Sequence, residues 1–239
     1  MKPPGPGLAQ RDEALTELMD DPDCDPRRLQ RTLRGFGLVN GAVSRWGAVY
    51  RTLLRPILAA TEAPARVLDI GSGGGDVLRR LARLARRDGF AIDGLGVDPD
   101  PRALDAAGRG PRTPGVRFTC ATSAEIRRSG DTFDLVVSNH VLHHLDEASF
   151  DALIDDSSAL AARACVHSDI ARGRLAYAAF SVAALPVAPG TFLRVDGLRS
   201  IRRSYTPAEL TARLPAEWRV ETVGRFRLLA VRRFSGAPR

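Results

Sequence analysis

A glycine-rich loop framed by carboxylates is the stretch of this chain best suited to chemistry. Residues 67–70 have the apolar character of a buried strand that carries Asp69, and the glycine-rich residues 71–75 follow directly. Glycines allow positive φ angles and let a ligand lie against the backbone. A helical apolar pattern begins after Asp76, which places a helix amino end beside the loop. Strand, glycine turn and helix amino end together can hold an adenosine-containing cofactor.

The carboxylates around this loop indicate which cofactor it takes. Asp98 ends a second apolar run at 92–97, where a carboxylate can accept two hydrogen bonds from ribose hydroxyls. A dinucleotide loop has a glycine where Asp76 stands, and Asp69 and Asp76 would both repel a diphosphate. They suit a ligand that carries an ammonium and a sulfonium, which is S-adenosylmethionine.

At these positions the sequence resembles the class I S-adenosylmethionine-dependent methyltransferases, in particular the small-molecule branch of ubiquinone and menaquinone biosynthesis. The first motif of that family is matched by residues 69–75 and the second by residues 96–99. The resemblance implies S-adenosyl-L-methionine as the cofactor. The residues predicted to bind it are Asp69, Gly71, Ser72, Gly73, Asp98, Pro99, Thr122, Ser123, Asn139 and His140.

Two of these assignments depend on later motifs of the family. Members of the family usually read the adenine with an acid after the third strand, and Thr122 stands at that position. Its hydroxyl can still accept one hydrogen bond, and the backbone amide of Ser123 can serve the ring. The fourth motif is matched by residues 133–140, so we expect Asn139 to approach the methionine part of the cofactor or the transferred methyl group.

The histidines are the candidates for a catalytic base, since imidazole titrates near neutral pH. Three of the four histidines follow the fourth predicted strand and His167 ends the fifth, and ligands of such sheets lie outside the carboxyl ends of the strands. We therefore predict the base among His143, His144 and His167, with the choice left open. His140, His143 and His144 would share one helical face, but the carboxylate triplet of catechol-methylating enzymes is not evident, so no metal is predicted.

The elements that position these residues alternate between strand and helix patterns. This alternation predicts an α/β fold with a doubly wound, Rossmann-like, mostly parallel sheet. Two β-patterned runs at 219–223 and 226–232 flank Gly224-Arg225 and predict a terminal hairpin; the family resemblance implies that it adds an antiparallel strand to a seven-stranded sheet. The parallel strands are expected at about 65–70, 92–97, 116–120, 133–138 and 163–168.

The predicted domain organisation has two parts, an N-terminal tail and helical cap over residues 1–60 and a methyltransferase domain over 61–239. Residues 1–11 are rich in proline and glycine and are predicted to be disordered. A short helix is expected at 13–19, and apolar residues recur at helical spacing from 43 to 57.

A lid-like insertion is predicted at about 170–206 within the methyltransferase domain. It contains an apolar stretch at 175–185, which is too short to cross a bilayer. A capping box at residues 206–209 predicts that a helix starts just after this insertion.

Composition limits the partners. The chain has 239 residues and a formal net charge of +7, and all but Lys2 of its 35 basic residues are arginines. Such a bias is typical of GC-rich bacterial genomes, and the arginines are interleaved with acids, so no nucleic-acid partner is predicted. Neither a secretory signal nor a membrane-spanning run is visible. A cytoplasmic protein is predicted, with peripheral membrane contact left open and the oligomeric state not assigned.

Together these features predict an enzyme that methylates a small, hydrophobic, aromatic, phenolic or quinone-like acceptor in quinone or secondary-metabolite biosynthesis. Transfer to oxygen with a histidine base is favoured, and transfer to carbon of a quinone- or polyketide-type acceptor stays as an alternative. Protein or nucleic-acid methylation is the other alternative. Enzymes that methylate amino groups of nucleic acids or proteins place Asn/Asp-Pro-Pro-aromatic after the fourth strand, whereas this chain has Asn139-His140-Val141-Leu142. This difference counts against an exocyclic amine as the acceptor.

Overall fold

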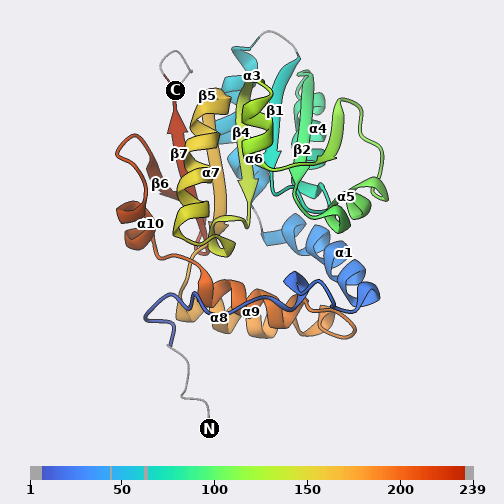
Figure 1. Ribbon diagram of the computed structural model, residues 1–239, viewed down its shortest axis with the longest axis vertical. Coiled ribbons are helices and arrows are strands. Elements are labelled where there is room, and N and C mark those ends of the chain that lie inside the picture. The colour runs from blue at the N-terminus through green and yellow to red at the C-terminus, as the bar shows by residue number, and fades with distance from the viewer. Residues whose placement is uncertain (1–6, 44, 62–63, 235–239) are drawn as a thin grey trace.

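The computed structural model describes residues 7–43, 45–61 and 64–234, and within these ranges seven strands form one sheet in the order β3-β2-β1-β4-β5-β7-β6. The first five strands pair in parallel, and β7 runs antiparallel to both β5 and β6. This confirms the Rossmann-like fold with a terminal antiparallel hairpin (Figure 1). The strands are β1 (Ala65–Ile70), β2 (Ile92–Asp98), β3 (Val116–Cys120), β4 (Phe133–Asn139), β5 (Ala161–Ile170), β6 (Arg219–Thr222) and β7 (Arg227–Arg233).

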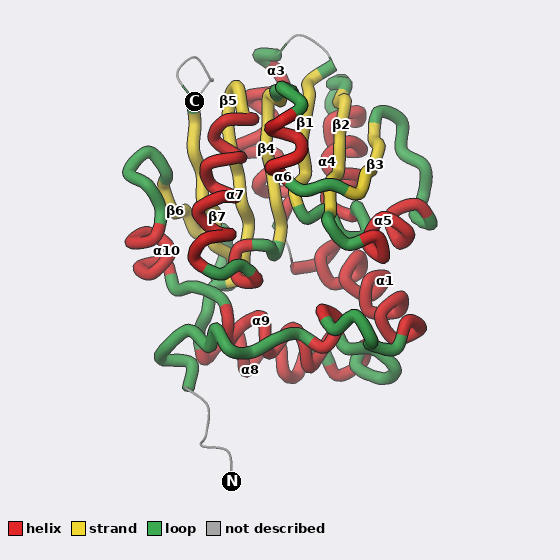
Figure 2. The backbone as a smooth tube through the Cα atoms, viewed as in Figure 1, coloured by secondary structure: helices red, strands yellow, loops and turns green. Residues whose placement is uncertain are grey.

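Helices cover both faces of this sheet (Figure 2). On one face the apolar side chains of α2, η2, α3 and α4 pack on the sheet, and on the other face those of α7 and α10 do so. The α-helices are α1 (Pro26–Val43), α2 (Trp46–Val49), α3 (Arg55–Ala59), α4 (Asp76–Arg87), α5 (Pro101–Gly108), α6 (Ser123–Arg128), α7 (Glu147–Leu160), α8 (Arg174–Ala183), α9 (Leu193–Arg203) and α10 (Pro207–Arg213). Shorter turns of 3₁₀- or π-helix are η1 (Leu18–Asp20), η2 (Tyr50–Leu54), η3 (Leu142–His144) and η4 (Leu185–Val187).

A cover lies across the carboxyl ends of the parallel strands. Helices α8 and α9 and the N-terminal segment lie together below the sheet in Figure 1, with α1 to one side. The carboxylate of Asp196 in α9 accepts hydrogen bonds from the backbone amides of Leu18 and Met19 at 2.7 and 3.1 Å. The insertion therefore holds residues from the beginning of the chain over the sheet edge. The division of the chain at residue 60 stays a prediction.

The N-terminal segment differs from the sequence prediction. In place of the helix expected at 13–19 the structure has the single turn η1, and the backbone amides of Leu18 and Met19 in this turn bond to the Asp196 side chain. Within the tail predicted to be disordered, residues 1–6 lie outside the described residues. Arg11 is ordered by its contacts, since its Nε donates to the carbonyl oxygen of Arg203 at 2.7 Å.

Other local predictions are confirmed. Of the helical spacing expected from 43 to 57, Val43 ends α1, and residues 46–57 lie in α2, η2 and α3, which follow one another without a break. Thr206 caps α10 and forms the expected capping box with Glu209. The apolar stretch at 175–185 forms α8 and leads into η4. Across the described part of the chain, no helix combines the length and apolar character required to cross a bilayer.

Gly71, directly after β1, is a position at which the fold requires glycine. Its φ angle is +67°, and a Cβ atom there would lie 2.5 Å from Cγ2 of Val141. We expect Gly71→Ala to lower the free energy of unfolding by about 1–3 kcal/mol, measured by thermal or denaturant unfolding. Gly108→Ala is the matched control, because its Cβ would meet nothing within 4 Å. Equal stabilities of the two variants would contradict this account of the turn.

Candidate functional site

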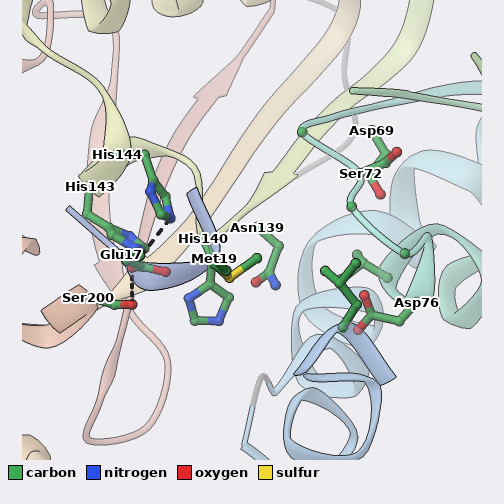
Figure 3. Close-up of a pocket in the computed structure, with 15 residues that line it drawn as sticks. Glu17, Met19, Asp69, Ser72, Asp76, Asn139, His140, His143, His144 and Ser200 are labelled. Atoms are coloured by element: carbon green, nitrogen blue, oxygen red, sulfur yellow. Dashed lines mark hydrogen bonds and ion pairs between the residues drawn. The ribbon is translucent and has the colours of Figure 1, made fainter. Parts of the chain in front are cut away.

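A cleft opens between the cover and the carboxyl ends of β1, β2 and β4. Two adjoining cavities of about 130 and 380 Å³ form it, and they have lining residues in common. Figure 3 shows the first cavity with the glycine-rich loop at one end and a group of histidines and a glutamate at the other. The residues that line both cavities are Met19, Leu33, Gly71, Gly73, His140 and His144.

The loop after β1 is held by backbone bonds and by one carboxylate. The amides of Gly71 and Ser72 both donate to the carbonyl oxygen of Val97, at 2.8 and 3.0 Å. The Asp98 carboxylate accepts from the amide of Gly73 at 2.9 Å and from the amide of Asp100 at 3.0 Å. Burial raises the pKa of Asp98. Asp98 thus fixes the loop and also lines the cleft, as does Pro99.

Asp69 is a buried carboxyl group that lines the cleft. Its residue is 1% exposed, and its Oδ2 has no hydrogen-bond partner among the described residues. Burial raises the pKa of Asp69 well above its usual value, and the nearby carboxylates of Asp76 and Asp98 raise it further. A cationic ligand would relieve this concentration of negative charge, because an unpaired buried charge is costly.

His143 lies at the other end of the cleft and is 0% exposed. Its Nδ1 is 2.7 Å from Oδ1 of Asp169, whose Oδ2 also accepts from the His143 backbone amide at 2.9 Å. On the opposite side of the ring, Nε2 is 3.4 Å from Oε1 of Glu17. Burial alone would lower the pKa of His143, but the two carboxylates outweigh it and raise that pKa to about 9.

His144 stands beside His143, with 4.2 Å between the ring centroids. Its side chain is 30% exposed, its Nε2 is 3.6 Å from Oε1 of Glu17, and its Nδ1 is 3.4 Å from Oδ2 of Asp20. Of the three predicted base candidates it is the one that reaches both the cleft and the solvent. Both histidines lie in the 3₁₀ turn η3, so the helical face expected for the histidine run does not form.

Asn139 and His140 lie between the two ends of the cleft, where Figure 3 labels them. The Oδ1 of Asn139 accepts a hydrogen bond from Nε1 of Trp46 at 3.0 Å, so the N-terminal helical layer orients this amide. His140 has a φ angle of +62°, a left-handed conformation that is uncommon outside glycine and clusters at functional sites.

The structure corrects the prediction for His167. Strand β5 extends to Ile170, so His167 lies inside the sheet instead of at its rim. The ring is 0% exposed, stacks on Trp218 with 5.3 Å between centroids, and has Nδ1 2.7 Å from the Ser138 hydroxyl. Burial lowers its pKa to about 4. His167 is a core residue and does not line the cleft.

Thr122 and Ser123 also have other partners than a ligand. Thr122 caps α6, where its hydroxyl accepts from the Glu125 amide and donates to the Glu125 carboxylate at 2.9 Å. The Ser123 hydroxyl donates to Asp156 of α7 at 2.7 Å. Neither residue lines the two cavities of the cleft. The structure therefore gives no support to an adenine contact from these two side chains.

Several residues of the cleft escaped the sequence analysis because they come from distant segments. Glu17 and Met19 belong to the N-terminal segment, and Ser200 belongs to α9. The Ser200 hydroxyl donates to Oε1 of Glu17. Asp169 at the end of β5 is also buried, with 1% of its surface exposed. No local pattern marks Glu17, because its neighbours in sequence carry no motif.

Two arginines fasten the histidine turn to the cover. Arg203 donates to the carbonyl oxygens of His143 and His144 at 3.1 and 3.0 Å, and also to that of Leu15. Arg11 donates to the carbonyl oxygens of His143 and Leu145 at 3.3 and 3.1 Å. The turn, α9 and the N-terminal segment are thereby held as one unit.

Comparison with known proteins places this architecture in a family. The model of a methyltransferase domain family matches residues 44–203. The chain belongs to the class I S-adenosylmethionine-dependent methyltransferases. This methyltransferase uses S-adenosylmethionine as its cofactor, and the buried Oδ2 of Asp69, which has no hydrogen-bond partner among the described residues, fits such a cationic ligand.

Individual relatives are more distant. The methyltransferase is 32% identical over 87 residues to the ubiquinone biosynthesis O-methyltransferase of Rhizobium etli (strain CIAT 652), which covers 36% of this chain and 33% of that protein. It is 31% identical over 151 residues to the protein of the same name from Methylobacterium sp. (strain 4-46), which covers 62% of this chain and 58% of that protein. The chain thus matches between about a third and three fifths of the length of these relatives.

A solved structure shares the fold alone. The plantazolicin methyltransferase BpumL, in complex with S-adenosylhomocysteine, superposes with a TM-score of 0.53 at 12% identity. The superposition covers 86% of this chain and 95% of that chain.

The burial of Asp69 yields a stability prediction. Because folding raises its pKa, the folded state loses stability as pH rises past the pKa of an unfolded aspartate. We expect Asp69→Asn to raise the free energy of unfolding of the ligand-free protein by about 1–3 kcal/mol at neutral pH, with the gain shrinking on acidification. Asp93→Asn is the control, since Asp93 is paired with Arg117 at the surface. A destabilised Asp69→Asn variant at neutral pH would contradict the assignment.

Proposed function

We propose that this methyltransferase transfers a methyl group to a hydroxyl of a small aromatic, phenolic or quinone-like acceptor. One observation carries the proposal: the cleft joins an acidic glycine loop at one end to a histidine–carboxylate cluster at the other. The first end suits a cationic methyl donor, and the second suits a group that must lose a proton. The names of the two relatives, both ubiquinone biosynthesis O-methyltransferases, support transfer to oxygen.

At the donor end, the glycine loop and three acids receive the cofactor. Gly71, Ser72 and Gly73 present their backbone to it, as the positive φ angles of the two glycines allow. Asp69 accepts from the ammonium group. Asp98, flanked by Pro99, takes the ribose hydroxyls while it continues to hold the loop through Gly73. S-adenosylmethionine supplies an electrophilic methyl group on a sulfonium when it is bound there.

In the middle of the cleft, Asn139 and His140 border the methionine part of the cofactor. Trp46 fixes the Asn139 amide, and the left-handed backbone of His140 directs the chain from β4 into the histidine turn. Alignment of donor and acceptor in such a closed site accounts for much of the rate of methyl transfer. The N-terminal layer therefore contributes to positioning as well as to packing.

At the acceptor end, His144 contacts the acceptor hydroxyl, and His143 positions the turn. His143 is committed to Asp169 on one side and faces Glu17 on the other, so it is not available as a free base. His144 has the exposure that a group in contact with a substrate requires. Met19 and Leu33 supply apolar surface between the two ends, which favours an aromatic acceptor over a charged one.

Cofactor binding is tested first. We expect Asp98→Ala and Asp69→Asn each to weaken binding of S-adenosylhomocysteine by about ten-fold or more, because each removes a charge-assisted hydrogen bond. Isothermal titration calorimetry measures the affinity. Asp93→Ala, on the same strand as Asp98 but paired with Arg117, is the control and should bind like the unmodified protein. Unchanged affinity of Asp98→Ala would refute the ribose contact.

Turnover tests the acceptor end. With isotopically labelled S-adenosylmethionine and a panel of substituted phenols and quinols, we expect a methyl ether as product. His144→Ala should lower kcat by about 100-fold and leave the affinity for S-adenosylhomocysteine unchanged. A labelled product methylated on carbon, or full turnover by His144→Ala, would rule out this form of the proposal.

A further inference from the structure

The Glu17 carboxylate lies between two imidazole nitrogens of the histidine turn. Oε1 of Glu17 lies 3.4 Å from Nε2 of His143 and 3.6 Å from Nε2 of His144. Nε2 of His143 is buried, faces this carboxylate and makes no hydrogen bond with any described residue. Three potential ligand atoms thus lie close together, at spacings longer than those of most hydrogen bonds.

These spacings are those of ligands around a small metal ion. In a tetrahedral site with bonds of ~2.0–2.1 Å, neighbouring ligand atoms are about 3.3–3.4 Å apart. The three atoms, one carboxylate oxygen and two imidazole nitrogens, all lie within 4.8 Å of one another. We propose that Glu17, His143 and His144 bind one divalent transition-metal ion of the Zn²⁺ class, with the remaining coordination position open to the cleft.

The surroundings of the three side chains are those of a prepared site. Histidine ligands of metals almost always hold their second ring nitrogen against a carboxylate or carbonyl. Nδ1 of His143 is 2.7 Å from Asp169, and Nδ1 of His144 is 3.4 Å from Asp20, so both rings direct Nε2 towards Glu17. The Ser200 hydroxyl bonds to the ligand oxygen of Glu17 and orients that carboxylate.

The donor atoms indicate which kind of ion the site would take. Two imidazoles with one carboxylate form a donor set that suits zinc, iron or nickel better than magnesium or calcium. A proton can also occupy the space between His143 and Glu17, and the ion would displace it.

The site lies where the acceptor is expected, and this part of the inference rests on the proposed function. With the ion bound, His144 acts on the acceptor through the ion and does not contact the hydroxyl directly. A hydroxyl oxygen that takes the open position has its pKa lowered by the ion. Its proton then passes to solvent water at the cleft mouth, and the resulting oxyanion is the nucleophile for the methyl group. No metal is predicted from the sequence because no carboxylate triplet accompanies the histidines. Glu17 is separated from the histidine pair by more than half of the chain.

Metal binding is tested without S-adenosylmethionine or acceptor, so that its failure is distinct from failure of the proposed function. The protein is treated with a chelator, dialysed and titrated with Zn²⁺ by calorimetry and with Co²⁺ by visible absorption. We expect one ion per chain and a Co²⁺ spectrum of low coordination number. Loss of a partner outside the ligand set already costs about 10–100-fold in metal affinity, so Glu17→Gln and His144→Ala should each lose about 100-fold or more.

Glu13→Gln is the matched control, since Glu13 lies on the same segment but pairs with Arg11 at the surface. It should retain the affinity of the unmodified chain. Glu17→Gln keeps the shape of the side chain and His144 is partly exposed, so both variants should fold, which circular dichroism checks. Absence of stoichiometric binding, or binding that survives in both Glu17→Gln and His144→Ala, would overturn the proposal.

Discussion

The structure depends on negative charge that is held away from water at the carboxyl ends of the strands. Asp69 is buried without a hydrogen-bond partner for Oδ2 among the described residues, and Asp76 and Asp98 add to the negative potential. Such a group destabilises the free protein. A cationic ligand supplies the missing partner of this carboxyl group. The loss of stability in the free protein and the affinity for S-adenosylmethionine therefore have one physical origin.

Carboxylates also gather at the opposite end of the cleft, where they flank two histidines. Asp169 and Glu17 flank His143, and Asp20 lies against His144. These carboxylates come from β5 and the N-terminal segment, which Asp196 and Arg203 tie to α9 and to the histidine turn. The cover thus shapes the acceptor end by supplying charged ligands as well as by closing the cleft. Donor and acceptor each meet carboxylates, separated by the apolar side chains of Met19 and Leu33.

Much of the fold could be predicted because its signals are local. The glycine loop, the alternation of strands and helices and the capping box at Thr206 are all encoded within short segments. The acceptor end of the cleft could not be predicted, because Glu17 contacts the histidine turn only through tertiary packing. His167 was misplaced since β5 continues to Ile170, and periodicity does not fix where a buried strand ends. The pairing of Asp169 with His143 could not be predicted, because the two residues follow different strands.

Proton exchange on ligand binding tests the central claim most directly. Calorimetric titration of S-adenosylhomocysteine at mildly acidic pH, in buffers of different ionisation enthalpy, counts the protons released or taken up. If the ammonium group of the ligand pairs with the carboxylate of Asp69, the carboxyl group loses its proton on binding. The unmodified protein should then release more protons than Asp69→Asn does. Equal proton counts for the two proteins would contradict the account.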